Sequence, residues 1–284
     1  MNIQTPAPQA LTFADYKSDL KPVWCPGCGD FSVLSAITKA LATLQLPRED
    51  VALVSGIGCS SRIPAYTSVY GFHSVHGRAL PVATGLKSAR PDLTVLVAGG
   101  DGDGFSIGGN HFLHACRRNV DLTYIVMDNS VYGMTKGQAS PTTEGDWTGS
   151  KLTPEGPGVA EFQPLEIALS AGANYIARGF SGKPNELTKL ICDAVEHPGF
   201  SLIHVLSPCV TFRPEQREYK TMVHDGFGGA AFDEGTPDRR EAFRRLMDDD
   251  GYSCGVLFKG NTPAFKPQTD APRTIEEIQG DFIL

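Results

Sequence analysis

Two kinds of hydrophobic pattern alternate along the first 210 residues of the chain. Short continuous runs of apolar residues, such as Val-Ala-Leu-Val-Ser at 51–55, are typical of strands buried on both faces of a parallel sheet. Between these runs, apolar residues recur three and four positions apart, which predicts amphipathic helices. The predicted strands are 51–55, 93–100, 122–129, 175–179 and 200–207, and the predicted helices are 31–44, 80–89, 108–118, 164–172 and 184–197. This alternation predicts an α/β fold with a doubly wound, mostly parallel sheet.

The segments outside this alternation have weaker patterns. Pro6 and Pro8 make the first twenty residues read as an extended arm, and a polar stretch rich in Gly, Thr and Pro covers 130–163. A charged helix is predicted at 238–250, within a tail that otherwise shows no clear pattern. We therefore predict three parts. They are an N-terminal arm at 1–20, a main α/β domain at 21–215, and a C-terminal extension at 216–284 that packs on the main domain.

Composition and charge limit the possible functions. A chain of 284 residues can bury a substantial core without disulfides or structural metals. Its net charge of −7 argues against nucleic acid as a partner and gives no sign of a basic electron-transfer surface. No apolar run approaches the ~18 residues that a membrane span needs, and the first twenty residues lack the pattern of a secretory signal. We therefore expect a cytoplasmic protein with reduced cysteines and no membrane partner.

Glycine-rich, polar or cysteine-bearing segments follow four of the predicted strands. These segments are 56–62, 99–109, 128–134 and 207–212. In an open α/β sheet, ligands bind outside the carboxyl ends of the strands. We therefore expect the four segments to converge on one ligand site.

The Gly-Asp-Gly triplet at 100–102 predicts a diphosphate site, because glycines let the backbone approach a phosphate and a following helix start favours an anion. Asp101 would offer Mg²⁺ a carboxylate, and Asn129 and the carbonyl of Val131 would add neutral oxygens at the end of the next strand. This arrangement resembles the diphosphate-binding motif of thiamine diphosphate enzymes. A plain glycine-rich turn is the alternative. Asp103, in an overlapping triplet, is a rival for Asp101, and the 28-residue spacing to Asn129 favours Asp101.

Cys25 and Cys28, in Trp-Cys-Pro-Gly-Cys-Gly, have three interpretations. A thioredoxin-like dithiol normally follows a strand, and no strand is predicted before Trp24. A zinc site and an iron–sulfur cluster both need two further ligands. Cys59 and Cys209 lie in two of the strand-end segments and would complete either set of four.

The other three cysteines have weaker claims. Cys116 and Cys192 lie within predicted helices beside apolar neighbours, so we interpret them as ordinary buried cysteines. Cys254 is the one serious rival for Cys209, but it does not follow a predicted strand.

Five motif-bearing segments then occur in combination, at 24–30, 55–62, 76–91, 99–119 and 128–143. The combination covers about residues 20–215 and resembles the β subunit of 2-oxoacid:ferredoxin oxidoreductases. The resemblance implies a pyrophosphate-type thiamine diphosphate domain with Mg²⁺ and one 4Fe–4S cluster. It assigns the cluster to Cys25, Cys28, Cys59 and Cys209, and Mg²⁺ to Asp101, Asn129 and the carbonyl of Val131.

The implied reaction is oxidative decarboxylation of a 2-oxoacid to acyl-coenzyme A and CO₂, with electrons passed through the cluster to ferredoxin. The form Gly-Asp-Gly-Asp-Gly-Phe-Ser-Ile-Gly-Gly is more similar to 2-oxoglutarate-type than to pyruvate-type enzymes. A larger α subunit would supply the aminopyrimidine pocket, giving an αβ unit paired into α2β2. Three alternatives stay open: a pyruvate-specific member, a non-redox thiamine diphosphate enzyme, and a zinc-stapled binding module.

Further residues are expected at the cofactor by the same resemblance. His76 is the predicted catalytic residue because it would face the diphosphate; the alternative is a capping histidine in a loop. His73 is a weaker candidate, and Ser61, Lys136 and Gln138 lie in segments expected to border the cofactor. His111 and His114 lack a third ligand and are interpreted as packing residues. The predicted cofactor contacts are Ile57, Gly58, Cys59, Ser60, His76, Gly77, Gly100, Asp101, Gly102, Asp103, Asn129, Val131, Gly133, Met134 and Thr135.

Overall fold

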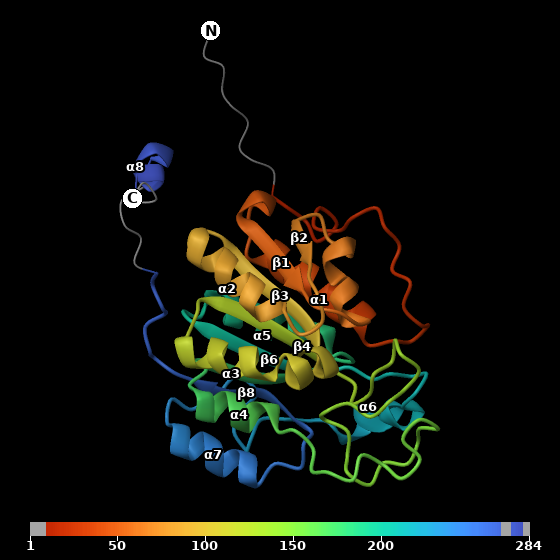
Figure 1. The fold of residues 1–284 in the computed structure, drawn as a ribbon. Helices are drawn as coiled ribbons and strands as arrows, with labels where there is room; N and C mark the ends of the chain where they lie inside the picture. Colours follow the sequence, from red (N-terminus) through yellow and green to blue (C-terminus); the bar gives the residue numbers. More distant parts are fainter. Residues whose placement is uncertain (1–9, 268–273, 281–284) are drawn as a thin grey trace.

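A sheet of eight strands forms the centre of the described chain, residues 10–267 and 274–280, in this computed structural model (Figure 1). Its order is β2-β1-β3-β4-β6-β5-β8-β7, and each neighbouring pair is parallel except β5 and β8. The strands are β1 Val51–Ser55, β2 Tyr70–His73, β3 Thr94–Gly100, β4 Leu122–Asp128, β5 Tyr175–Phe180, β6 Phe200–Leu206, β7 His224–Asp225 and β8 Ser253–Lys259. The parts of the predicted arm and extension at 1–9, 268–273 and 281–284 lie outside the described residues.

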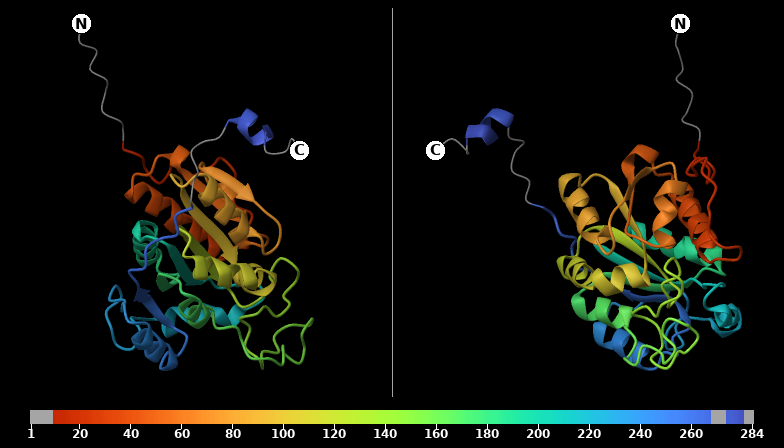
Figure 2. Two further views of the ribbon diagram at one scale, coloured as in Figure 1. Left: turned by 60° about the vertical axis from the view of Figure 1, so that its left-hand side comes forward. Right: turned by 45° about the vertical axis from the view of Figure 1, so that its right-hand side comes forward.

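Helices cover both faces of the sheet, as Figures 1 and 2 show. Alternate residues of β3 point to opposite faces, so that Val95 and Val97 join one core while Leu96 and Ala98 join the other. The first core includes α2, α3, α4 and α7, and the second includes α1 and α5. The helices are α1 Asp30–Thr43, α2 Ala79–Ala89, α3 Gly109–Arg118, α4 Pro164–Ala171, α5 Pro184–Glu196, α6 Tyr219–Met222, α7 Arg239–Met247 and α8 Ile275–Gly280. The predicted doubly wound, mostly parallel α/β fold is confirmed.

Three segments differ from the prediction. The edge strand β2 was not expected, since it has four residues, all exposed. Residues 10–20 are docked against the domain: the Tyr16 side chain is fully buried and its hydroxyl donates to the Leu46 carbonyl (2.6 Å). The predicted arm is therefore part of the packed domain over its described residues.

The third difference is β8, which lies in the tail where we expected no strand. It runs antiparallel to β5 and is buried from Ser253 to Phe258, so the central sheet crosses the boundary predicted at residue 215. Two features hid it from the sequence. Gly255 has φ +135°, which is unusual inside a strand, and the pairing register shifts beside Ile176.

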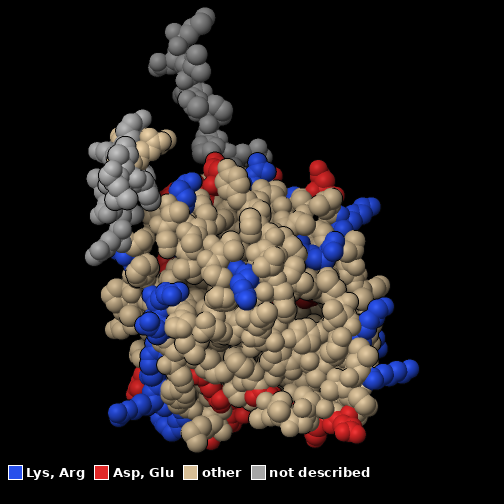
Figure 3. Space-filling view, in the orientation of Figure 1, with Lys and Arg blue, Asp and Glu red and all other residues tan. Residues whose placement is uncertain are grey.

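Charged side chains are distributed unevenly over the surface. In Figure 3, Lys and Arg side chains occur along the right-hand edge, and acidic groups gather near the lower end. The net charge of −7 therefore does not describe every face. Among the described helices, none is long and apolar enough to cross a membrane.

Candidate functional site

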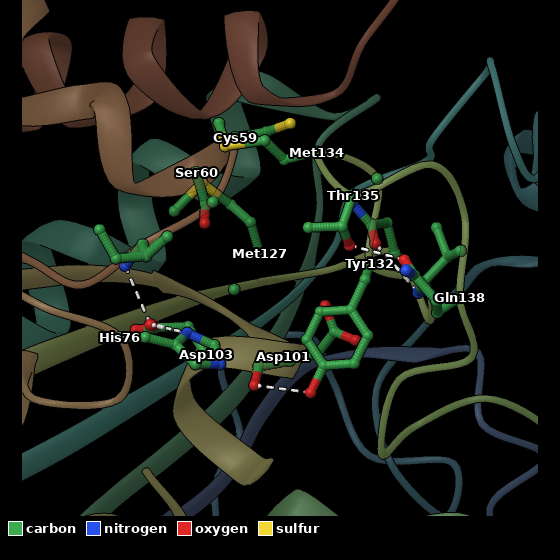
Figure 4. A pocket seen from close by; sticks show the side chains of 17 residues that line it. Cys59, Ser60, His76, Asp101, Asp103, Met127, Tyr132, Met134, Thr135 and Gln138 are labelled. Carbon is green, nitrogen blue, oxygen red and sulfur yellow. Dashed lines mark hydrogen bonds and ion pairs between the residues drawn. The ribbon is translucent and has the colours of Figure 1, made fainter. Parts of the chain in front are cut away.

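A cavity of about 430 Å³ opens at the carboxyl ends of β1, β3 and β4 (Figure 4). Its volume lies within the range of ~300–1,000 Å³ that is typical of ligand and cofactor sites. Three of the four predicted strand-end segments contribute to its wall, together with His76. The lining residues are Ile57, Gly58, Cys59, Ser60, His76, Gly100, Asp101, Gly102, Asp103, Met127, Asn129, Val131, Tyr132, Gly133, Met134, Thr135 and Gln138. All the predicted cofactor contacts except Gly77 thus line one cavity, and their contact with a cofactor stays a prediction.

Glycine is required at two points of the wall. Gly58 has φ +124°, and a Cβ added there would meet nothing within 4 Å, so the backbone faces open space. A Cβ on Gly102 would lie 2.3 Å from the ring of Tyr132, whose hydroxyl donates to the Gly102 carbonyl (3.2 Å). Tyr132 and Met127 were not predicted as lining residues. Tyr132 could have been, since predicted residues flank it on both sides.

Asp103 holds two loops together beside the cavity. Its Oδ1 accepts hydrogen bonds from the backbone N–H groups of Ile57 (2.9 Å) and Gly77 (2.8 Å) and lies 2.9 Å from Nδ1 of His76. Its Oδ2 is buried and has no hydrogen-bond partner among the described residues, and a Cβ on Gly56 would lie 1.9 Å from it. Asp103 is thus committed to these loops, and the structure favours its rival Asp101 as a metal ligand.

Gly77 and two other candidates lie away from the cavity. Gly77 points its N–H at Asp103 and does not line the wall, because a Cβ on it would meet Ile107 at 2.5 Å. Ser61 is fully buried and outside the wall, and its carbonyl lies 2.8 Å from Nδ1 of His73. Ser61 and His73, which we expected near the cofactor, are therefore not among the residues that line the cavity and belong to the packing between β2 and its neighbours.

Asp101 carries the acidic group at the floor of the cavity. It is buried, and Thr142 donates a hydrogen bond to its Oδ2 (3.1 Å). Burial and the nearby carboxyl of Asp128 raise the pKa of Asp101 to about 8. A bound divalent cation would favour the ionised form of this carboxyl and so reverse the effect of burial.

The neighbouring loop offers two neutral oxygens beside Asp101. Asn129 accepts a hydrogen bond from the Val131 N–H (3.1 Å), which fixes its side chain. In residues 10–267 and 274–280, no donor reaches the carbonyl of Val131. One carboxylate and two neutral oxygens suit Mg²⁺, which completes its shell with water and phosphate. No group of three or more His, Cys, Asp and Glu residues in the described chain is arranged around one metal ion. A site with one carboxylate does not require such a group.

A chain of polar side chains continues from Asp101 into the protein. The same Thr142 hydroxyl lies 2.7 Å from Oδ1 of Asp128, so its one proton is shared between the two carboxyls. The other oxygen of Asp128 accepts a hydrogen bond from Nε2 of His204 (2.8 Å). The Arg178 Nε donates to Nδ1 of His204 (3.3 Å), and Arg178 forms an ion pair with Asp249. Because Nδ1 is an acceptor, the His204 proton lies on Nε2.

The carboxyls of Asp101 and Asp128, which share Thr142, have pKa values shifted in opposite directions. Burial opposes ionisation of Asp128, but the hydrogen bond from His204 holds the pKa of Asp128 below its usual range. Asp101, without such a partner, holds its proton more tightly. Sequence reasoning missed this chain, because Asp128 and His204 are single polar residues in apolar strands.

The four predicted cluster ligands are brought together beside the cavity, although they lie in three separate segments. The sulfurs of Cys59 and Cys209 lie 4.0 and 3.8 Å from the position that a Cβ on Gly133 would take. Cys25 and Cys28 lie close enough to belong to the same group of thiols. Cys25 contributes to the raised pKa of Cys59, and Cys59 contributes to the raised pKa of Cys28. The CxxC segment is tied to the Cys59 loop by the Trp24 Nε1–H, which donates to the Cys59 carbonyl (2.8 Å).

Burial makes two of these thiols, those of Cys28 and Cys59, poor thiolates in the absence of metal. Burial, followed by Asp30 and then Cys209, raises the pKa of Cys59 to about 11. Burial, followed by Asp30, raises the pKa of Cys28 well above its usual range. Iron would keep such thiols deprotonated. In a 4Fe–4S cluster each iron takes one cysteine, so the four sulfurs surround the cluster rather than one ion. The residues present therefore fit a cluster.

The remaining cysteines are placed as packing residues. Cys116 in α3 and Cys192 in α5 belong to the two hydrophobic cores. Cys254 in β8 packs with Phe180 and Leu206 in a separate small cluster. This placement favours Cys209 over Cys254 as the fourth ligand.

The segment after β4 covers the cavity as expected. Thr135 and Gln138 both line it, and the Thr135 hydroxyl donates to the Gln138 side chain (2.6 Å). Lys136 is exposed and adopts φ +86°. His111 and His114 are half-buried in α3, and within the described part of the chain the buried Nδ1 of His114 has no hydrogen-bond partner.

Comparisons with known proteins agree with this geometry. The family model "Thiamine pyrophosphate enzyme, C-terminal TPP binding domain" matches residues 56–205. The 2-oxoacid:ferredoxin oxidoreductase subunit beta of a Sulfolobus species is 46% identical over 281 residues, covering 89% of this chain and 91% of that protein. The 2-oxoglutarate oxidoreductase subunit KorB of Mycobacterium tuberculosis is 48% identical over 199 residues, covering 70% of this chain. The match spans only 53% of that relative's length.

A solved structure is also similar. The 2-oxoglutarate:ferredoxin oxidoreductase from Magnetococcus marinus, with 2-oxoglutarate, coenzyme A and succinyl-CoA bound, superposes with a TM-score of 0.83 at 42% sequence identity. The superposition covers 90% of this chain and 87% of that chain.

Proposed function

Since the chain belongs to the β subunits of 2-oxoacid:ferredoxin oxidoreductases, we propose that it forms the thiamine diphosphate- and cluster-binding part of such an enzyme. The reaction is the oxidative decarboxylation of a 2-oxoacid to acyl-coenzyme A and CO₂, with transfer of the electrons to ferredoxin. One observation carries the proposal. The cavity at the strand ends has the magnesium-type oxygens of Asp101, Asn129 and Val131 on one side and Cys59 of the four-cysteine group on the other.

The described residues have distinct tasks in this proposal. Asp101, Asn129 and the Val131 carbonyl would hold Mg²⁺ and through it the diphosphate. Asp103 orients the loops that carry Ile57 and His76, so that the cavity wall is formed before any ligand enters. Thiamine diphosphate, when bound, supplies the electron sink for decarboxylation.

The group of cysteines serves the redox half of the reaction. Cys25, Cys28, Cys59 and Cys209 would hold a 4Fe–4S cluster, and such a cluster would supply one-electron transfer to ferredoxin. Cys59 lines the cofactor cavity and also belongs to the cysteine group, so it lies between the two sites.

We propose 2-oxoglutarate as the substrate. The M. tuberculosis, Archaeoglobus fulgidus and Methanocaldococcus jannaschii relatives are named for 2-oxoglutarate, and the M. marinus structure contains it with coenzyme A. The partner is a larger α subunit that completes the cofactor site, in an α2β2 assembly. Two exposed apolar side chains beside the cavity loop, Val75 next to His76 and Ile107 against Gly77, support a protein interface on this side.

The test compares substrates on the complex of this chain with its α subunit. We expect reduction of a viologen dye that depends on coenzyme A and is faster with 2-oxoglutarate than with pyruvate. Faster turnover of pyruvate would identify pyruvate as the substrate instead. A colourless complex that contains zinc instead of iron would replace the redox function by the zinc-stapled alternative. Decarboxylation with no dye reduction by an iron-loaded complex would indicate a non-redox thiamine enzyme.

A further inference from the structure

The segment that carries Cys209 is hydrogen-bonded to the loop that carries the predicted Mg²⁺ ligands. Three consecutive carbonyls of that loop, at 128–130, accept hydrogen bonds from residues of 207–216. The bonds join Ser207 N to Asp128 O (2.8 Å), Gln216 Nε2 to Asn129 O (2.8 Å) and Arg213 Nη1 to Ser130 O (3.0 Å). The next carbonyl, that of Val131, is left for the metal. The two segments are therefore attached by one backbone hydrogen bond and two hydrogen bonds from side chains of the Cys209 segment to carbonyls of the loop.

Gln216 is the residue that contacts both predicted ligands. Its side-chain Oε1 accepts a hydrogen bond from the Cys209 N–H (2.9 Å), while its Nε2 donates to the Asn129 carbonyl (2.8 Å). Only this orientation of the amide satisfies both partners, since one is a donor and the other an acceptor. The Gln216 side chain is 1% exposed, so water does not take over either bond.

The backbone around Gln216 is fixed as well. The Gln216 N–H donates to the Arg213 carbonyl (3.0 Å), and the Arg213 N–H donates to the Cys209 carbonyl (2.8 Å). Cys209 is thus held at both its N–H and its carbonyl by the turn that follows it. Because this backbone is fixed, it cannot easily shift to absorb a movement of Cys209 relative to Asn129.

We propose that Gln216 is a positioning residue that sets the spacing between the cluster ligand Cys209 and the Mg²⁺ ligand Asn129. The inference rests on the proposed function, which places a cluster at one end of this amide and the cofactor's diphosphate at the other. Electron transfer depends steeply on separation, so a rigid connection between the two sites keeps the transfer distance constant. Outer residues of this kind orient metal ligands, and their loss typically lowers affinity about 10- to 100-fold.

Two substitutions separate the two ends of the amide. Gln216→Glu keeps an acceptor for the Cys209 N–H but turns a carboxylate oxygen toward the Asn129 carbonyl. In the complex with the α subunit, we expect normal iron content and a normal electron paramagnetic resonance spectrum of the reduced cluster. The Mg²⁺-dependent affinity for thiamine diphosphate, measured by calorimetry, should fall about 10- to 100-fold.

Gln216→Met has a similar length but neither polar group, so both ends are lost. We expect the same fall in thiamine diphosphate affinity and, in addition, a changed spectrum of the reduced cluster, because the Cys209 N–H is released. Glu218→Gln is the matched control. It lies in the same short helical turn, Pro214–Glu218, and its side chain is exposed. It should leave affinity and spectrum unchanged.

Outcomes that contradict the inference are distinct from failure of the proposed function. If the unaltered complex takes up neither iron nor thiamine diphosphate, the proposed function itself is wrong. If it takes up both, and a folded Gln216→Met complex binds thiamine diphosphate as tightly with an unchanged cluster spectrum, Gln216 does not position the sites. The same conclusion follows if Gln216→Glu alters the cluster while leaving cofactor affinity intact. Because Met introduces no buried charge, it remains informative if the Glu variant does not fold.

Discussion

Replacing Asp101 by Asn should stabilise the cofactor-free chain while removing its ability to bind Mg²⁺ and thiamine diphosphate. The folded chain raises the pKa of this fully buried carboxyl from 3.8 to about 8. Because the folded-state value lies above the unfolded-state value, the folded chain must hold a proton that the unfolded chain releases. Its stability therefore falls as the pH rises from about 4 to about 8.

The size of this effect follows from the shift. One pKa unit corresponds to about 1.4 kcal/mol, so the carboxyl of Asp101 costs about 4 kcal/mol at pH 7 and about 2 kcal/mol at pH 5. Asn is neutral at both pH values and can still accept the hydrogen bond from Thr142. The Asp101→Asn chain should therefore exceed the unaltered chain in stability by about 4 kcal/mol at pH 7 and by about half as much at pH 5.

Urea unfolding of the metal-free chain at both pH values measures these differences. The matched control is Asp103→Asn, which should be less stable than the unaltered chain, because it weakens the hydrogen bonds to Ile57 and Gly77. Adding Mg²⁺ and thiamine diphosphate in the presence of the α subunit should stabilise the unaltered chain but not Asp101→Asn. An Asp101→Asn chain no more stable than the original at pH 7, or a gain that is the same at pH 5, would refute the reasoning.

Three further predictions concern the ligands and the partner. Calorimetry of thiamine diphosphate with Mg²⁺ should show a severe loss of affinity for Asp101→Ala and a smaller loss for Asp103→Ala; the reverse order would move the metal site to Asp103. Single Ser substitutions should lower the iron content and bleach the visible absorption at Cys25, Cys28, Cys59 and Cys209. Cys254→Ser should leave both intact. If Cys254→Ser loses the cluster while Cys209→Ser keeps it, Cys254 is the fourth ligand. The isolated chain should not reduce a viologen dye with any 2-oxoacid until the α subunit is added. Robust turnover with the partner excluded by mass spectrometry would disprove the divided site.

Local patterns predicted much of the fold and of the cavity. The Gly-Asp-Gly triplet and Asn129 each end an apolar strand, and parallel strands place their carboxyl ends at one edge, so their meeting follows from the order of elements. The cysteines were located for the same reason, since Cys59 and Cys209 also follow strands. Strand β8 escaped because Gly255 and a register shift blur its pattern.

Contacts between distant residues could not be predicted in this way. The Gln216 amide reaches the Asn129 carbonyl across 87 positions, and the pairing of Asp128 with His204 spans 76. Each of these residues is an unremarkable polar side chain in its own segment. Their roles depend on which strands become neighbours in the sheet, and a strand inserted between β4 and β6 would abolish the pairing of Asp128 with His204.

The ion pair between Arg178 and Asp249 makes the tail inseparable from the rest of the protein. A shortened gene ending near residue 215 would retain every predicted ligand but remove Asp249 and strand β8, leaving the β5 edge uncovered. Arg178, only 7% exposed in the full chain, would lose its carboxylate partner and the strand that covers it. Arg178 also holds His204, and His204 holds Asp128 beside the metal loop. Truncation would therefore disturb the cofactor site through Arg178, His204 and Asp128. The α/β domain cannot be isolated as a smaller unit by ending the chain after its last motif.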